Sequence, residues 1–246
     1  MRQRVCLALT VILLIFAPAG AEAGCPESAQ VAHSAVSIMK HFDAEEAAAQ
    51  PGLVGIRGTG WFLTPTRIVT VEHVATAMHL SHQDWKPLEI VDRDTSRSVS
   101  ARIHRLAGLH SEKLAVLDLQ RAVSGARSLA VRRAPLAPEE RVVTLADPMR
   151  HLQYVDGRFV QIGDDERLAG AALLEMYDGG DRLAVDHGAS GAPVLDCEGR
   201  VAAVVSHVIT QTLTMVSREI RVSTAWGTPN VVSVPIQVLD ESFRAE

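Results

Sequence analysis

The sequence predicts an all-β protein made of two small β-barrels packed together. From residue 53 to residue 119, short runs rich in Val, Ile, Leu and Thr alternate with clusters of Gly, Pro, Asp and Ser. This alternation is typical of barrels and sandwiches. A similar set of runs lies between residues 141 and 239, and the proline-containing segment 134–140 separates the two sets. We therefore expect one barrel at about 50–133, a linker at about 134–140 and a second barrel at about 141–240.

The N-terminal residues predict a secretory signal peptide. Arg2 and Arg4 precede an apolar run at 5–17, and residues 21–23 (Ala-Glu-Ala) fit a cleavage site. The apolar run is too short to span a membrane as a helix. We expect cleavage after Ala23, a mature domain at 24–246 that is secreted or periplasmic, and no membrane association once the signal peptide is removed. The Ala-rich segment 28–50 is expected to hold a helix, or a short strand and a turn.

The composition argues against several classes of function. Without the signal peptide the chain keeps 22 of its 24 basic and 28 of its 29 acidic residues, so no electrostatic basis for nucleic-acid binding exists. No phosphate-binding or dinucleotide-binding glycine pattern is present, and no cofactor is expected. The spacing of His73, His79 and His82 fits no common metal motif, so no metal is expected. Cys25 and Cys197 form a disulfide or remain free thiols.

Two motifs carry the chemistry. The stretch 58–75, GTGWFLTPTRIVTVEHVA, combines two glycines, a turn, a short strand and His73, and the stretch 187–193, HGASGAP, holds Ser190 between small residues. A nucleophilic serine needs a general base and an oxyanion site, and a histidine is the usual base near neutral pH. Glycines beside the serine allow the backbone to bend so that amide groups converge on one point.

These motifs resemble those of the chymotrypsin-like and trypsin-like serine proteases, of the bacterial secreted type without a PDZ domain. The likeness extends over nearly all of residues 50–240. The matching positions of the two motifs are Gly58, Thr59, Gly60, Trp61, Pro65, Thr70, His73, Val74, Gly188, Ala189, Ser190, Gly191, Ala192 and Pro193. The resemblance implies two six-stranded antiparallel barrels with the active site in the cleft between them. It also implies that His73 is the base, Ser190 the nucleophile, and the amides of Gly188 and Ser190 the oxyanion hole.

The third member of the triad departs from the family pattern. The family's acid falls on Lys113, and Glu72 stands where a small residue is usual. A lysine there would oppose the imidazolium that His73 becomes during reaction. Glu112, one residue earlier, is the favoured acid, because a bulge or loop at the strand start can re-aim its side chain. Three further carboxylates stay open as alternatives: Asp92, Asp94 and Asp118.

The resemblance implies a secreted serine endopeptidase that acts on polypeptide substrates. Ala184, six residues before the serine, would lie at the base of the primary pocket and favour a small or medium apolar side chain, with Asp186 close enough to leave this preference open. Asp186 and His187 are interpreted as loop residues. The alternatives are a weakened protease fold that binds an extended peptide by strand addition, and an esterase that uses the same Ser-His pair. The oligomeric state stays open.

Overall fold

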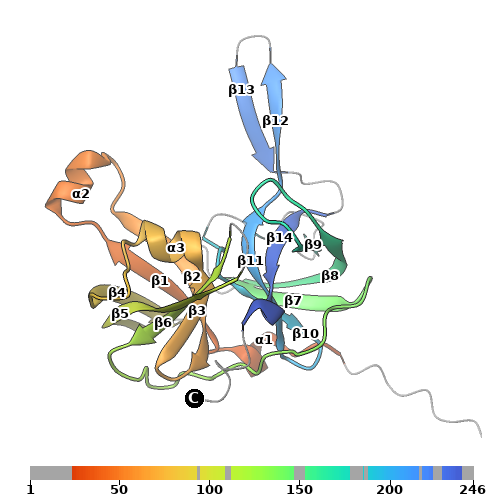
Figure 1. Cartoon of the computed structure of the whole chain (residues 1–246), viewed down its shortest axis with the longest axis horizontal. Helices are drawn as coiled ribbons and strands as arrows, with labels where there is room; N and C mark the ends of the chain where they lie inside the picture. Colours follow the sequence, from red (N-terminus) through yellow and green to blue (C-terminus); the bar gives the residue numbers. More distant parts are fainter. Residues whose placement is uncertain are drawn as a thin grey trace, which may run out of the picture.

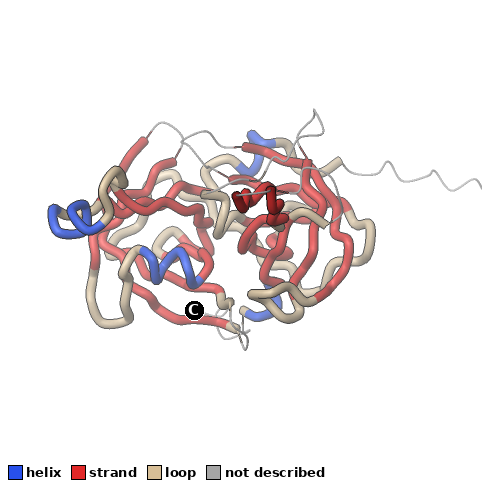
Figure 2. The backbone as a smooth tube through the Cα atoms, turned by 90° about the horizontal axis from the view of Figure 1, so that it is seen from above, coloured by secondary structure: helices blue, strands red, loops and turns tan. Residues whose placement is uncertain are grey.

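The chain folds into two closed antiparallel β-barrels of six strands each, set side by side (Figures 1 and 2). The computed structural model describes residues 24–92, 95–108, 112–146, 153–177, 185, 188–215, 218–223 and 229–239. The predicted signal peptide lies outside this range. The predicted all-β class and the two six-stranded barrels are confirmed. No helix in the described part of the chain is long and apolar enough to cross a membrane.

The first barrel closes on a strand that precedes its predicted start at about residue 50. Its strands, in the order in which they pair, are β1 (Ala35–His41), β2 (Gly55–Thr64), β3 (Arg67–Val71), β6 (Leu114–Leu119), β5 (Thr95–Ala107) and β4 (Lys86–Asp92). Strand β1 pairs with β2 on one side and with β4 on the other. The barrel therefore begins near residue 35, because without β1 both β2 and β4 would be open edges.

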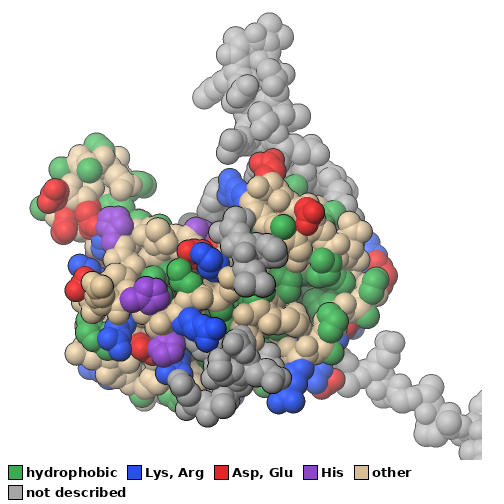
Figure 3. Space-filling view, in the orientation of Figure 1, with side chains coloured by type: hydrophobic (Ala, Val, Ile, Leu, Met, Phe, Trp, Pro, Cys, Tyr) green, Lys and Arg blue, Asp and Glu red, His purple; other side chains and the backbone are tan. Residues whose placement is uncertain are grey.

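A projecting arm connects β1 to β2 (Figure 1). It carries the short helix α2 (Ala44–Ala49), which begins where the Asp43 carboxylate accepts hydrogen bonds from the Glu45 and Glu46 amides. Acidic and hydrophobic side chains cover the arm in Figure 3, and Val54 at its base is 79% exposed. The arm adds no strand to the barrel and contributes nothing to its core.

The second barrel contains six of the remaining strands. In pairing order they are β10 (Pro193–Asp196), β11 (Val201–Val208), β14 (Val231–Pro235), β9 (Ala171–Tyr177), β8 (Gln153–Gly163) and β7 (Arg141–Ala146). A separate hairpin of β12 (Thr210–Met215) and β13 (Arg218–Ser223) projects from it (Figure 1). The turn η1 (Ile236–Val238) follows β14. The core of the second barrel is dominated by Val and Ala side chains, which agrees with the low aromatic content of the sequence.

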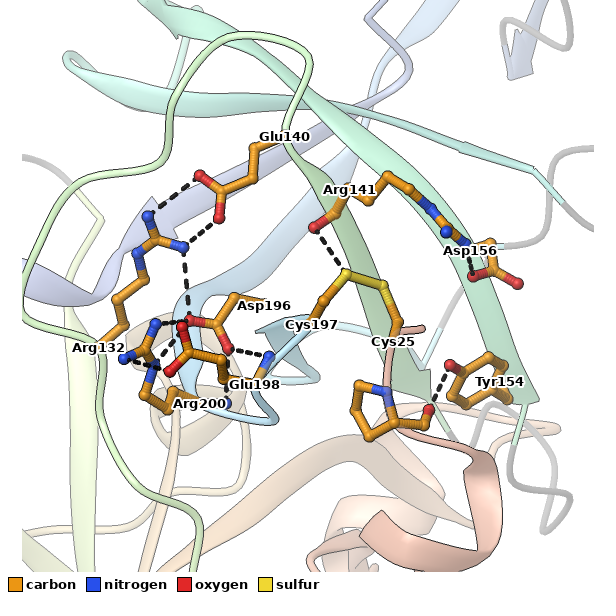
Figure 4. The surroundings of a disulfide bond; sticks show 11 residues. Cys25, Arg132, Glu140, Arg141, Tyr154, Asp156, Asp196, Cys197, Glu198 and Arg200 are labelled. Carbon is orange, nitrogen blue, oxygen red and sulfur yellow. Dashed lines mark hydrogen bonds and ion pairs between the residues drawn. A yellow bond between two sulfur atoms is a disulfide. The ribbon is translucent and has the colours of Figure 1, made fainter. Parts of the chain in front are cut away.

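The segment between the barrels is held against the second barrel. The Arg132 amide donates to the Val201 carbonyl, at 2.8 Å. The Arg132 guanidinium binds both Glu140 and Asp196 (Figure 4), and its side chain is only 12% exposed. The connection is therefore packed and paired where it crosses β11.

A disulfide ties the N-terminal segment to the second barrel. Cys25 and Cys197 are bonded across a sequence separation of 172 residues, and Tyr154 donates a hydrogen bond to the carbonyl of Pro26 beside them (Figure 4). From Cys25 the chain runs through α1 (Ser28–Val31) into β1 of the first barrel. The bond therefore links the two barrels, and it decides between the two states that the sequence left open for these cysteines.

Candidate active site

The register of two strands places His73 opposite Glu112. Strands β3 and β6 are antiparallel, and their last pair joins Val71 to Leu114. His73 follows Val71 by two residues, in the first turn of α3 (Glu72–Ala77), and Glu112 precedes Leu114 by two residues. The two side chains therefore leave the same end of one strand pair.

His73 and Glu112 are in direct contact. Nδ1 of His73 lies 3.0 Å from Oε2 of Glu112, and the His73 amide donates to Oε1 at 3.4 Å. The imidazole is 47% exposed, whereas the carboxylate is 10% exposed. Burial raises the pKa of the Glu112 carboxyl, but the hydrogen bonds and charge of His73, with a contribution from the charge of His207, outweigh burial and hold this pKa below its ordinary range.

Lys113 is turned toward Glu72, the other residue that departs from the family pattern. Its Nζ lies 3.5 Å from Oε1 of Glu72, and its carbonyl accepts a hydrogen bond from the Glu72 amide at 2.8 Å. The ammonium group that occupies the family's acid position is therefore balanced by the carboxylate that occupies a small residue's position.

The other candidate acids lie apart from His73 or outside the described residues. Asp92 is buried and binds Nδ1 of His33 at 2.8 Å. Asp118 binds Nε of Arg67 at 3.2 Å and Nδ1 of His104 at 3.1 Å. Asp94 lies outside the described range. Of the carboxylates that the structure describes, Glu112 is the one bonded to His73.

The loop that carries Ser190 belongs to the second barrel but is bonded to the first. The Thr59 amide in β2 donates to the Ser190 carbonyl at 2.9 Å, and the Thr59 hydroxyl donates to the Gly188 carbonyl at 2.7 Å. A Cβ atom on Gly58 would lie 2.6 Å from Val74 Cγ1 and 3.4 Å from the Ser190 carbonyl oxygen. The helix of His73 and the serine loop therefore pack together at Gly58.

Gly188 and Gly191 shape the backbone on either side of the serine. Their φ angles are +97° and +92°, in the region that favours glycine. No described residue accepts a hydrogen bond from the Gly188 or Ser190 amide. A Cβ atom on Gly191 would lie 2.0 Å from the Thr59 carbonyl oxygen and 2.2 Å from Thr70 Oγ1. At Gly191 the serine loop thus lies so close to the first barrel that a side chain larger than that of glycine would clash.

We expect the substitution Gly191→Ala to destabilise the protein by more than about 2 kcal/mol, because it adds a clash with backbone to an unfavourable φ. Gly52→Ala is the matched control: its φ is +88°, but nothing lies within 4 Å of its added Cβ. It should cost about 1 to 2 kcal/mol through φ alone. Urea unfolding measures both, and equal losses in the two variants would contradict the close approach.

Ser206 connects Ser190 to Glu112, and it was not among the site residues predicted from the sequence. The Ser190 hydroxyl donates to the Ser206 carbonyl at 2.8 Å, and Ser206 Oγ lies 3.5 Å from Oε2 of Glu112. Because a hydroxyl has one proton, the Ser190 hydroxyl must give up its bond to the Ser206 carbonyl before it can donate to His73. The signal in the sequence was the pair Ser206-His207, which interrupts the apolar run of β11.

Several predicted features lie beyond the described residues. Ala184, Asp186 and His187 are outside them, so the primary pocket and its preference stay predictions. Within the described ranges, no three His, Cys, Asp or Glu side chains gather as a metal site requires. His79 lies 2.9 Å from Glu46 on the surface of the first barrel.

The fold and the residues between the barrels define the chymotrypsin-like double-barrel class of proteins. The chain belongs to the trypsin-like peptidase family: the family model for the trypsin-like peptidase domain matches residues 58–204. This range contains His73, Glu112, Ser190 and the glycines around them. The resemblance drawn from the two motifs is confirmed.

Solved structures with the same fold include two forms of one bacterial protease and a second protein. The Rv3671c protease from M. tuberculosis in its active form has a TM-score of 0.58 and 17% identity, over 95% of this chain and 89% of that one. Its inactive form has a TM-score of 0.55 and 15% identity, over 89% of this chain and 92% of that one. Deg5 has a TM-score of 0.51 and 17% identity, over 73% of this chain and 82% of that one. No curated protein sequence matches the chain.

Proposed function

We propose that this protein is a secreted serine endopeptidase that cleaves polypeptides through an acyl-enzyme formed on Ser190. The observation that carries the proposal is the contact between Nδ1 of His73 and Glu112, at 3.0 Å. A carboxylate on Nδ1 keeps the proton on that nitrogen and leaves the Nε2 lone pair free to accept a proton. His73 then has the tautomer that a general base for Ser190 requires.

In the proposed mechanism Ser190 turns from the Ser206 carbonyl toward Nε2 of His73 and attacks the scissile carbonyl carbon. His73 takes the serine proton and passes it to the leaving amine, and Glu112 stabilises the imidazolium in between. The amides of Gly188 and Ser190 hold the oxyanion, each contributing about 3 to 4 kcal/mol to the stabilisation of the transition state. Water then enters, and the same groups hydrolyse the ester. No cofactor takes part in these steps.

The secreted or periplasmic location is part of the proposal, with a signal peptide cleaved after Ala23. The disulfide between Cys25 and Cys197 supports it, because disulfides persist in oxidising compartments outside the cytosol. Cleavage after Ala23 would make Cys25 the second residue of the mature chain, and the disulfide to Cys197 would then hold the new N-terminus against the second barrel. The proposed partner is a polypeptide substrate.

The test is fluorophosphonate labelling of the mature protein, because this reagent reacts with an activated serine. We expect one label on Ser190, found by mass spectrometry, with none on Ser190→Ala. Ser128→Ala removes an exposed serine that precedes the second barrel in the chain; it is the control and should take the label as the wild type does. Labelling together with cleavage of a denatured protein substrate supports the endopeptidase.

Two outcomes would overturn the proposal. A wild-type protein that takes no label would favour a peptide-binding module on a weakened protease fold. A protein that takes the label on Ser190 and hydrolyses esters but no peptide would be an esterase.

A further inference from the structure

Another histidine–carboxylate pair, His207 and Asp165, lies beside the candidate site and is connected to it through Ser206. His207 follows Ser206 in β11, and its Nδ1 lies 3.0 Å from Ser206 Oγ. Its Nε2 lies 2.8 Å from Oδ1 of Asp165, in the loop between β8 and β9. Both side chains are largely buried, with 17% and 19% of their surfaces exposed. Ser206 is fully buried, and its hydroxyl lies within hydrogen-bond distance of both His207 and Glu112.

The hydrogen bonds of this group follow from donor and acceptor chemistry. An ionised Asp165 only accepts, so Nε2 of His207 carries a proton. When His207 is neutral, Nδ1 has no proton and accepts the hydroxyl proton of Ser206. Glu112 then accepts no hydrogen bond from the Ser206 hydroxyl, although Ser206 Oγ lies 3.5 Å from its Oε2.

Protonation of His207 reverses this arrangement. Both ring nitrogens become donors, so Nδ1 donates to Ser206 Oγ. Among the described residues, the acceptor that remains for the Ser206 proton is Oε2 of Glu112. Since Oε2 is also the oxygen that His73 contacts, the two hydrogen bonds meet on one atom.

We propose that Asp165 and His207 are positioning residues of the candidate site: the protonation state of His207 decides whether Ser206 donates its hydroxyl proton to His207 or to Glu112. A carboxylate that accepts an additional hydrogen bond holds an imidazolium less strongly. Protonated His207 therefore weakens the support that Glu112 gives to His73. This inference rests on the proposed function, and it makes that function respond to a proton bound away from the reacting atoms.

The surroundings of His207 are consistent with this coupling. In the part of the chain that the structure describes, the charged groups connected to it are Asp165 from the β8–β9 loop and, through Ser206, Glu112 from the loop before β6, with His73 beyond it. On the strand beside it, β14, its partner is the apolar Val232. The Arg167 amide binds the same Asp165 oxygen at 3.1 Å and fixes that carboxylate.

The direct test follows the ring signals of His73 by NMR across the range in which histidines ionise. The Ser190→Ala background prevents self-cleavage. We expect His73 to follow two ionisation steps, one of them shared with His207, and to follow a single step in His207→Phe. In Asp165→Asn, which removes the carboxylate that stabilises the cation, the shared step should move to lower pH. His104→Phe, which breaks the His104–Asp118 contact elsewhere on the first barrel, should leave the His73 curve unchanged.

Kinetics supply a second readout that a purely structural role would not move. In His207→Phe the Ser206 hydroxyl donates to Glu112 at every pH. At pH values above the shared ionisation step, the wild type should therefore exceed the variant in kcat/KM by about tenfold. This is the size expected for one hydrogen bond to a charged group. The two proteins should converge below it. A ratio that stays constant with pH would overturn the inference.

The NMR and activity results separate this inference from the proposed function. Peptide hydrolysis with a single-step His73 curve would overturn the coupling and leave the endopeptidase intact. A two-step curve that disappears in His207→Phe, in a protein that hydrolyses no peptide, would support the coupling and remove the proposed function.

Discussion

Replacing Glu112 with glutamine is expected to lower kcat about ten-thousand-fold with little change in KM, the loss found when a triad acid becomes an amide. The glutamine amide occupies the same space, but when its oxygen accepts from the His73 amide, as Oε1 does in the wild type, its NH2 group donates where Oε2 accepted. Nδ1 of His73 must then accept, and the proton moves to Nε2, where Ser190 needs a free lone pair. Steady-state cleavage of a peptide substrate measures the effect.

Asp118→Asn is the matched control, because Asp118 is a partly buried carboxylate on β6, the strand that follows Glu112, and it is bonded to Arg67 and His104 and not to His73. Its kcat should stay within about tenfold of the wild type. The double variant Glu112→Gln/Lys113→Asp should stay inactive, since Lys113 is directed at Glu72. Recovery in the double variant would show that residue 113 faces His73 after all.

The same glutamine variant reports the pH dependence of stability. The folded protein holds the pKa of Glu112 below its ordinary range, where burial opposes and His73 favours the charged form. Its stabilising contribution is therefore present above the unfolded-state pKa and is lost as the pH falls through the lower folded-state pKa. The wild type should exceed Glu112→Gln in unfolding free energy at neutral pH, and the gap should narrow in acid.

Removing the disulfide is expected to cost about 2 to 5 kcal/mol of unfolding free energy, because the bond closes a loop of 172 residues. The variant Cys25→Ser/Cys197→Ser frees the N-terminal segment from the second barrel, while β1 stays paired in the first. Unfolding by urea, with and without a reducing agent, measures the loss.

The reducing agent provides the control for this prediction. It should lower the stability of the wild type to that of the double serine variant and leave the variant unchanged. The prediction would be contradicted if the wild type and the variant had equal unfolding free energies, or if the unfolding free energy of the wild type did not change when the bond was reduced.

Much of the fold could be predicted because its signals are local. Short Val-, Ile- and Leu-rich runs between turn residues indicate strands whether or not their partners are known. The strand β1 was missed as part of the barrel because its short run lies in segment 28–50, where the neighbouring Ala-rich residues that form α2 allowed a helix as well as a strand. Only its pairing with both β2 and β4 makes it a barrel strand.

The sequence by itself determined the two barrels, the family, and the motifs around His73 and Ser190, because those properties depend on residue types at short spacings. It left four carboxylates as candidates for the acid and two states for Cys25 and Cys197. The tertiary structure placed Glu112 at His73, turned Lys113 to Glu72 and joined the cysteines. It also brought Asp165, Ser206 and His207 beside the site. These contacts join residues up to 172 positions apart, and strand register, not local pattern, sets which of them meet.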